Sequence, residues 1–197
     1  NPMINAGAIA VDSLIAGEGV EDKLNRLIGF IRMLCHNDQI WFSQEVYQSE
    51  STTGLRNRAL ANFMKDAGII EGDVEEVLDL YFKQCAIEVN AIDIAMMGAV
   101  LAGDGVSPVT GDILIPKSIA RLVKTFMVTC GMYDASGEFA VRVGLPAKSG
   151  VGGGILAAVP GKMGIGVYGP ALDSKGNSAG GIKVLEYISR NLNLSIF

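Results

Sequence analysis

Apolar residues recur at helical spacing along the first two thirds of the chain. The clearest case is residues 22–35, where apolar side chains three and four positions apart define one face of a helix. The same spacing, bounded by capping residues, proline or glycine, predicts further helices. Together the helical segments cover residues 5–15, 22–35, 43–53, 56–65, 74–85, 91–102 and 117–130.

Polar residues and proline indicate where several of these helices begin. Asn5 is expected to cap the first helix, and Asn90 the helix that follows it directly. Asp73, with Glu76 three residues later, fits the capping-box pattern. Pro116 stands where the first turn of a helix tolerates proline. The sequence therefore marks where these helices begin.

The pattern changes after residue 131. Residues 155–159 and 163–168 are typical of two short strands, and the Pro160-Gly161 pair between them predicts an antiparallel hairpin. Residues 173–177 indicate a turn. Apolar positions at helical spacing beyond this turn predict a closing helix.

Length, composition and charge narrow the functional classes. A chain of 197 residues with 49% hydrophobic content suits a packed protein of the α+β class, with a mainly helical part over 1–131 and a sheet-containing part over 132–197. The net charge of -5 is mild and the basic residues are scattered, which argues against nucleic-acid or anionic-membrane partners. The longest apolar run, residues 94–103, is about half a membrane span. A small-molecule partner is therefore favoured.

The cysteines and the single histidine offer little chemistry. Cys35, Cys85 and Cys130 are far apart and lack Cys-x-x-Cys spacing, which argues against disulfides and a zinc site. We expect them to be buried thiols of a cytoplasmic protein. His36 lies at a helix end, where a solvated cap or a partner of the helix dipole is more common than a catalytic base.

A glycine-rich stretch over residues 144–155 carries the strongest candidate chemistry. Lys148, Ser149 and Gly150 have the pattern of a strand end against which a ligand can lie. Lys148 and Ser149 would hold an anionic group, and the backbone N–H of Val151 would face a developing oxyanion. The alternative is a glycine-rich hairpin at a sheet edge. A phosphate cradle fits less well, because no Gly-Lys-Ser/Thr ending follows the glycines.

Four other polar residues are candidates for binding or proton transfer. Glu50 and Asn57 lie on one side of a helix if Gly54 only bends it, and would then bind an α-ammonium group and a carboxylate or amide. The alternative is a surface glutamate and a helix-capping asparagine. Tyr81 falls on an apolar stripe, which favours core packing. Tyr133 is expected on a glycine-flanked loop, where its hydroxyl could relay protons.

Three stretches together resemble a known family. They are Asn1-Pro2-Met3-Ile4-Asn5-Ala6-Gly7-Ala8-Ile9, Gln48-Ser49-Glu50 with Arg56-Asn57, and Cys130-Gly131-Met132-Tyr133 through Lys148-Ser149-Gly150-Val151. They closely resemble the glutaminase family of serine-dependent hydrolases, over almost the whole chain. The resemblance implies the fold of serine β-lactamases and penicillin-binding proteins, with the active site between the helical part and the sheet. It also implies conversion of L-glutamine and water to L-glutamate and ammonia through an acyl-enzyme.

The resemblance further assigns roles to particular residues. Those implied to hold the substrate are Asn5, Glu50, Asn57 and Tyr81. Tyr133 would contact the substrate and lie beside the nucleophile as a proton relay, and Val151 would offer its backbone N–H to the oxyanion hole. Lys148, a further catalytic candidate, matches the Lys-Thr/Ser-Gly strand of the β-lactamases. No metal or organic cofactor is implied, and relatives form homo-oligomers, so a dimer or tetramer is expected.

The family's nucleophile has no counterpart in the chain. It is a serine with a lysine three residues later, and no serine here has that spacing. In relatives the motif lies upstream of the Asn-Pro-Met segment, so we expect it before residue 1. The chain would then be the C-terminal two-thirds of one glutaminase catalytic domain, inactive alone. Two alternatives stay open: another acyl-transferring enzyme of this fold, acting on β-lactams or cell-wall peptides, and a non-catalytic module that binds an amino acid.

Overall fold

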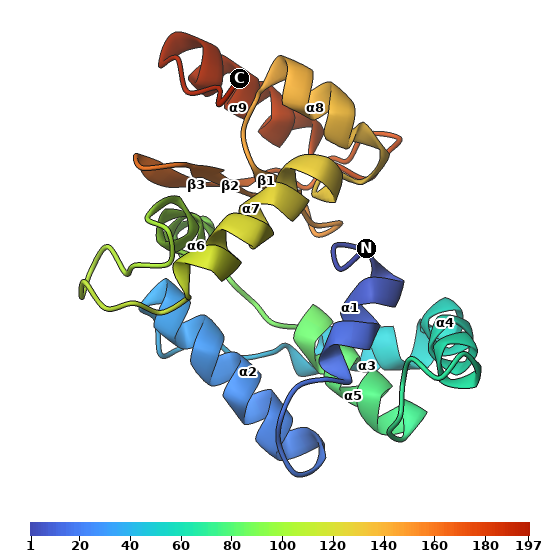
Figure 1. Cartoon of the computed structure of the whole chain (residues 1–197). Helices are drawn as coiled ribbons and strands as arrows, with labels where there is room; N and C mark the ends of the chain where they lie inside the picture. The colour runs from blue at the N-terminus through green and yellow to red at the C-terminus, as the bar shows by residue number, and fades with distance from the viewer. The chain divides into compact units, whose positions relative to one another are not determined.

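The computed structural model describes all residues from 1 to 197 and divides the chain into two compact units (Figure 1). The first, which we call the helical unit, comprises Asn1–Arg32 and Asp38–Glu88. The second, the mixed unit, comprises Met33–Asn37 and Val89–Phe197. Each unit has a hydrophobic core of its own.

The helical unit is built around its last helix. Its helices are α1 (Asn5–Asp12), α2 (Gly19–Cys35, whose last turn belongs to the mixed unit), α3 (Gln44–Thr53), α4 (Leu55–Asp66) and α5 (Val74–Cys85). Helix α5 contacts α1, α3 and α4. Its apolar face supplies Leu78 and Phe82 to a core that also holds Ile9 and Met64. Burial of these side chains orders α1, α3 and α4 around α5.

The mixed unit combines helices with one small sheet. Its elements in chain order are α6 (Ala91–Ala102), α7 (Lys117–Cys130), the 3₁₀-helix η1 (Tyr133–Ala135), α8 (Ser136–Arg142), β1 (Ala147–Ser149), β2 (Gly154–Val159), β3 (Met163–Tyr168) and α9 (Ala179–Asn191). The strands are antiparallel in the order β1-β2-β3. Lys148 pairs with Leu156, which in turn pairs with Gly166.

Helices cover both faces of this sheet (Figure 1). On one face α6 approaches so closely that a Cβ at Gly164 would lie 2.0 Å from the Ala95 carbonyl oxygen. Glycine is therefore required at this position. On the other face α8 and α9 contribute Phe139 and Leu185 to a core shared with Ile155 of β2. Helices on both faces thus hold the sheet in place. Strand β1 forms one edge of the sheet, and the turn that follows β1 lies at this edge.

Most of the predicted elements are confirmed. The hairpin, the 173–177 turn and the closing helix are all present, and the Asp73 carboxylate caps α5. The reciprocal capping box belongs to the next helix, where Asn90 and Asp93 bond each other's backbone N–H groups.

Three local predictions were wrong. Helix α1 ends at Asp12 rather than at residue 15, and Ile4, not Asn5, occupies its N-cap position. Asn5 instead uses its side chain in a long-range hydrogen bond described below. The segment that carries Tyr133 is not a loop but the helical pair η1 and α8.

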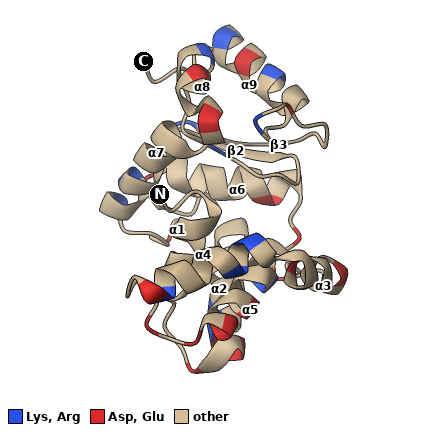
Figure 2. Cartoon of the chain, turned by 90° about the vertical axis from the view of Figure 1, so that its right-hand side faces the viewer, with Lys and Arg blue, Asp and Glu red and all other residues tan.

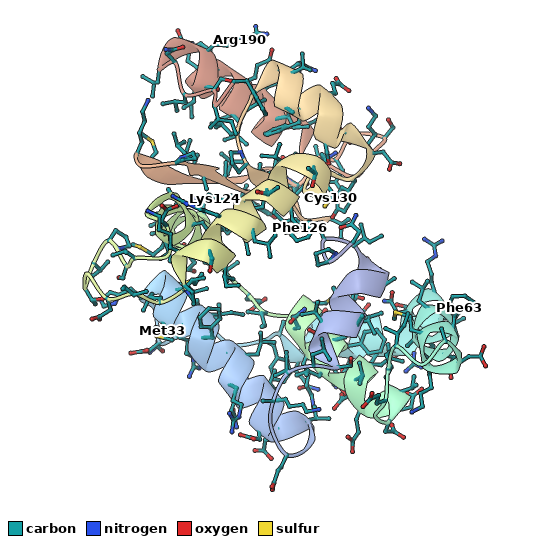
Figure 3. The ribbon with its side chains drawn as sticks, in the orientation of Figure 1. Met33, Phe63, Lys124, Phe126, Cys130 and Arg190 are labelled. Carbon is teal, nitrogen blue, oxygen red and sulfur yellow. The ribbon has the colours of Figure 1, made fainter.

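The cysteines are free but not uniformly buried. Cys35 is buried, as expected, whereas Cys85 is exposed and Cys130, labelled in Figure 3 at the end of α7, is partly exposed. No three histidine, cysteine or acidic side chains gather where they could hold a metal ion.

Acidic and basic side chains form ion pairs along the closing helix α9. Acidic and basic residues alternate on α9, where Glu186 pairs with both Arg142 and Arg190 (Figure 2). None of the helices combines the length and apolar character that crossing a bilayer would require.

Candidate functional site

In the helical unit two candidate residues are joined directly. The Asn5 Nδ2 atom, at the start of α1, donates a 3.0 Å hydrogen bond to Asn57 Oδ1, in the first turn of α4. Asn57 is only 8% exposed, while Asn5 is exposed. Because the bond uses the acceptor of Asn57, its two amide N–H groups keep a defined direction. Such an amide pair can orient a carboxylate or an amide of a ligand.

Glu50 and Asn57 reach this region from two helices rather than one. Gly54 ends α3 and begins α4, so the break predicted there is confirmed. The single bent helix on which Glu50 and Asn57 would have shared one face is therefore not formed. A Cβ at Gly54 would lie 2.5 Å from Phe82 Cζ, which explains why the join is a glycine. Arg58 ties the helices together, donating a 2.8 Å hydrogen bond to the Ser51 carbonyl.

Tyr81 lies in a negatively charged part of the helical unit. The ring is buried in the core, as predicted, and its hydroxyl bonds the Cys85 thiol one turn later. Burial raises the pKa of Tyr81, and the carboxylates of Asp12 and Glu50 raise it further. Asp12 is itself 2% exposed, and burial raises its pKa to about 7 despite a hydrogen bond from Gln84. Negative charge near a buried phenol favours a cation such as an α-ammonium group.

Asp12 was not found by the sequence analysis. It follows Val11 at the end of a short helix, a position that usually faces water, and no motif marks it. Only the packing around α1 shows that its carboxyl group is enclosed. One of its oxygens, Oδ2, has no hydrogen-bond partner within the protein.

In the mixed unit Lys148 and Ser149 lie on the edge strand β1. The Lys148 Nζ atom lies 4.7 Å from the centroid of the Tyr133 ring, a cation–π contact, and donates a hydrogen bond to the Ser149 carbonyl. Burial lowers the pKa of Lys148. Ser149 is 1% exposed, its N–H donates to the Gly131 carbonyl at 3.0 Å, and its hydroxyl has no partner within the protein.

Tyr133 joins this strand to the glycine-rich turn. It begins η1 with a backbone φ of +52°, and its hydroxyl accepts a hydrogen bond from the backbone N–H of Val151. Burial raises the pKa of Tyr133, while this N–H opposes the rise. The structure therefore brings a phenol, an ammonium group and a backbone donor into one place within the unit, as residues Tyr133, Lys148 and Val151.

The glycine-rich turn also has the geometry of a hairpin at a sheet edge, which was the alternative prediction for this stretch. It connects β1 to β2, and the Gly150 N–H donates to the Gly154 carbonyl at 2.9 Å. Gly153 adopts a φ of +95°, and a Cβ there would lie 2.7 Å from the Gly169 carbonyl oxygen. These constraints leave Val151 70% exposed at the tip of the turn. The edge-hairpin interpretation is therefore confirmed, and the ligand-binding role of this stretch stays a prediction.

The histidine takes no part in these arrangements. His36 is exposed and follows the last residue of α2 with a φ of +52°. This is the left-handed conformation common just beyond a helix C-terminus. A helix-end position, as the sequence indicated, accounts for it.

Comparison with solved structures identifies the fold class of the chain. Its fold matches that of a solved Bacillus subtilis glutaminase, determined as a covalent complex with 5-oxo-L-norleucine formed by reaction with 6-diazo-5-oxo-L-norleucine. The TM-score is 0.97 and the identity 46%, over 100% of this chain and 70% of that one. A second solved structure, of a Bacillus glutaminase in 4.3 M NaCl, gives a TM-score of 0.96, 46% identity and coverage of 100% and 67%. The chain is thus a member of the β-lactamase-like fold class.

The family follows from sequence. The family model described as Glutaminase matches residues 1–197, and the chain belongs to the glutaminase family. It is 63% identical to a glutaminase of Clostridium tetani and 60% identical to one of Geobacillus thermodenitrificans, each over 197 residues. These alignments cover 100% of this chain and 64% of each relative. The chain thus spans slightly less than two thirds of these curated relatives.

Proposed function

We propose that the natural protein to which this chain belongs hydrolyses L-glutamine to L-glutamate and ammonia through a serine acyl-enzyme. The observation that carries the proposal is the hydrogen bond from the Val151 N–H to the Tyr133 hydroxyl, beside the Lys148 ammonium. A backbone donor and a phenol at one point are what an acyl transfer needs to stabilise an oxyanion and to move a proton to the leaving amine.

The helical unit would supply substrate recognition. Glu50 would neutralise the α-ammonium of glutamine, in a region where Asp12, when ionised, adds negative charge to the surroundings of Tyr81. Asn5 and Asn57, fixed by their mutual hydrogen bond, would orient the polar ends of the substrate. Tyr81 would contact the substrate with a hydroxyl that burial keeps protonated.

The reaction would proceed in two steps. A serine hydroxyl would give its proton to the amine of the lysine three residues later as its oxygen attacks the side-chain amide carbon, and that proton would return through Tyr133. The backbone N–H of Val151, released from the Tyr133 hydroxyl, would stabilise the oxyanion of the tetrahedral intermediate. Tyr133 passes a proton to the amide nitrogen, so ammonia leaves and an ester to the serine remains. Water then attacks the ester, and glutamate leaves as the serine recovers its proton. Lys148 lowers the cost of negative charge on the Tyr133 phenol.

The nucleophile would lie outside residues 1–197. No serine of the chain has a lysine three residues later, and the relatives are about half as long again. A Ser-x-x-Lys segment upstream would complete one catalytic domain, and the enzyme would act as a homo-oligomer without a metal or organic cofactor.

Two measurements test the proposal. The natural protein should release ammonia from glutamine, and residues 1–197 expressed alone should release none. Turnover of a β-lactam or a cell-wall peptide in place of glutamine would favour another enzyme of this fold. Glutamine binding without turnover by the natural protein would favour a non-catalytic binding module.

A further inference from the structure

The backbone of Tyr133 is held in an unfavourable conformation. Its φ of +52° falls in the left-handed region, which an aromatic residue seldom adopts unless its surroundings enforce it. This torsion sets the direction in which the phenol leaves the chain. The surroundings that enforce it therefore also determine where the hydroxyl lies.

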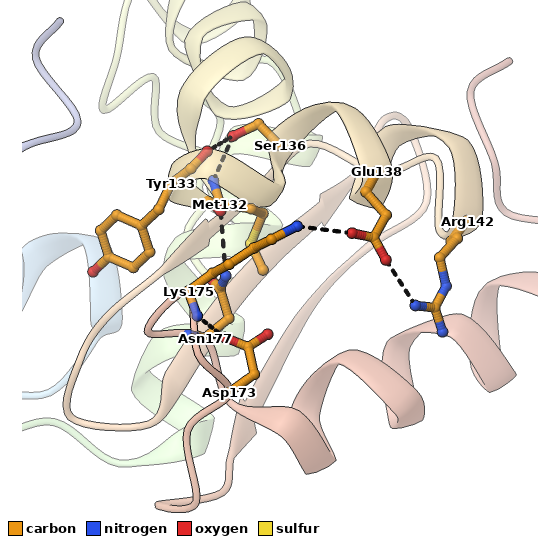
Figure 4. A network of polar contacts seen from close by, with 8 residues as sticks. All are labelled: Met132, Tyr133, Ser136, Glu138, Arg142, Asp173, Lys175 and Asn177. Atoms are coloured by element: carbon orange, nitrogen blue, oxygen red, sulfur yellow. Dashed lines mark hydrogen bonds and ion pairs between the residues drawn. The ribbon is translucent and has the colours of Figure 1, made fainter.

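Two polar side chains fix the peptide groups on either side of this torsion (Figure 4). The Ser136 hydroxyl accepts a 3.1 Å hydrogen bond from the Met132 N–H and donates one of 2.8 Å to the Tyr133 carbonyl. The Asn177 Nδ2 atom donates to the Met132 carbonyl at 3.3 Å. Both side chains are buried, Asn177 completely and Ser136 at 6% exposure.

Asn177 is delivered by the 173–177 turn, which the turn's own contacts stabilise. The Asp173 carboxylate accepts hydrogen bonds from the backbone N–H groups of Lys175, at 2.9 Å, and of Asn177, at 3.0 Å. Lys175 Nζ contacts the Glu138 carboxylate of α8 at 3.0 Å. The turn is therefore tied both to itself and to the helix that follows Tyr133.

The same turn also meets the phenol ring. A Cβ built at Gly176 would lie 3.8 Å from Tyr133 Cε2 and 3.9 Å from a side-chain methyl of Val151. The backbone of the turn therefore passes beside both partners of the hydrogen bond from the Val151 N–H to the Tyr133 hydroxyl. Displacing the turn would alter both.

We propose that Asn177 and Ser136 are positioning residues, which hold the Tyr133 backbone in its left-handed conformation so that the phenol meets the Val151 N–H. They contact only the backbone next to Tyr133 and act on the reaction through it. The proposal rests on the proposed function, because Tyr133 is taken to relay the proton there.

The test compares three variants of the natural protein. Asn177→Ala removes one hydrogen bond and Ser136→Ala removes two. Asn191→Ala is the matched control, because Asn191 Nδ2 also donates to a carbonyl, that of Tyr187 at 2.8 Å, but on the exposed end of α9. We expect kcat for glutamine to fall at least tenfold in N177A and S136A, KM to change less than threefold, and N191A to match the wild type.

A second background separates positioning from general damage. In Tyr133→Phe, adding N177A should not lower kcat further, because the hydroxyl that Asn177 positions is already gone. Equal losses in both backgrounds would overturn the proposal. If N177A does not fold, S136A carries the same comparison.

A structural measurement is independent of turnover. Crystal structures of N177A and S136A should show Tyr133 outside the left-handed region, without its bond to the Val151 N–H. Retention of both features in the two variants would overturn the positioning role. If the wild-type protein turned over no glutamine, the proposed function would fail, and these structures would still decide whether Asn177 and Ser136 position Tyr133.

Discussion

The Lys148 ammonium lies 4.7 Å from the centre of the Tyr133 ring, and it does so from a partly buried position on β1. Burial lowers the pKa of Lys148, so at neutral pH the folded state holds a cation whose hydration is incomplete. Such a group is poorly explained by stability alone. Its position supports the proposed role of Tyr133 as a proton relay.

Replacement of Lys148 by Met should therefore separate activity from stability. We expect kcat/KM for glutamine to fall at least tenfold, while the free energy of unfolding near pH 7 changes by less than about 1 kcal/mol, because lost desolvation offsets the lost cation–π contact. Steady-state kinetics and denaturant unfolding of the natural protein measure the two. A large loss of stability with unchanged kinetics would make Lys148 a structural residue.

Glu50→Gln tests how the α-ammonium is held. Removing the charge should raise KM for glutamine by roughly ten- to a hundredfold, the cost of about 1.5–3 kcal/mol for a charge-assisted hydrogen bond. Glu45→Gln is the matched control, because Glu45 is an exposed residue of the same helix. Equal kinetics for the two variants would remove Glu50 from the site. An unchanged KM for glutamine with E50Q would also favour an enzyme acting on β-lactams.

Asp12 gives the helical unit a pH dependence. Its pKa rises from 3.8 in the unfolded chain to about 7 in the folded one, so the folded state binds the proton more tightly. Its contribution to stability is full below pH 4 and is lost as the pH rises to about 7. The total loss in the free energy of unfolding over this pH range is on the order of a few kcal/mol. Asp12→Asn cannot titrate, so its stability relative to wild type should rise from pH 4 to 7 and then level off.

Denaturant unfolding of the natural protein across this range checks that expectation. A difference between D12N and wild type that stays constant from pH 4 to 9 would mean that Asp12 titrates normally. Asp38→Asn serves as the control, because Asp38 is an exposed aspartate of the same unit.

Gly54 is expected to govern the join between α3 and α4. Gly54→Ala would place a Cβ 2.5 Å from Phe82 Cζ and 2.8 Å from the Glu50 carbonyl oxygen. Overpacking of this kind costs about 1–3 kcal/mol, and displacement of Glu50 should raise KM for glutamine. Gly29→Ala is the control, since nothing lies within 4 Å of a Cβ there. It should be neutral or slightly stabilising. A normal KM in G54A would show that the join tolerates adjustment.

The elements that the sequence predicted well are those determined by local pattern. Helix α5, with its Asp73 cap, and the β2–β3 hairpin follow from spacing and turn chemistry within a dozen residues. Asn5 shows where this fails. Its local signal is that of a cap, but a partner 52 residues away takes its side chain. Nothing near Asn5 in the sequence identifies Asn57 as that partner.

The candidate site shows the same division. Motif resemblance indicated Tyr133 and Val151, but not that Tyr133 would start a 3₁₀-helix with a positive φ. One of the contacts beside this torsion comes from Asn177, 45 residues beyond Met132, and no local pattern announces it. The spacing of apolar residues did not predict helix α8, because this helix is only seven residues long and contains a glycine. Burial of Asp12 likewise depends on packing between helices.

The location of the nucleophile can be measured directly. Treatment of the natural protein with 6-diazo-5-oxo-L-norleucine, the compound that reacts covalently with the Bacillus subtilis glutaminase, followed by peptide mass spectrometry, identifies the modified residue. We expect a single modified serine upstream of residue 1, with a lysine three positions later. Modification inside residues 1–197, for example at Ser149, or no modification of an active enzyme, would contradict the assignment of this chain as the part of a glutaminase that binds substrate and stabilises the oxyanion.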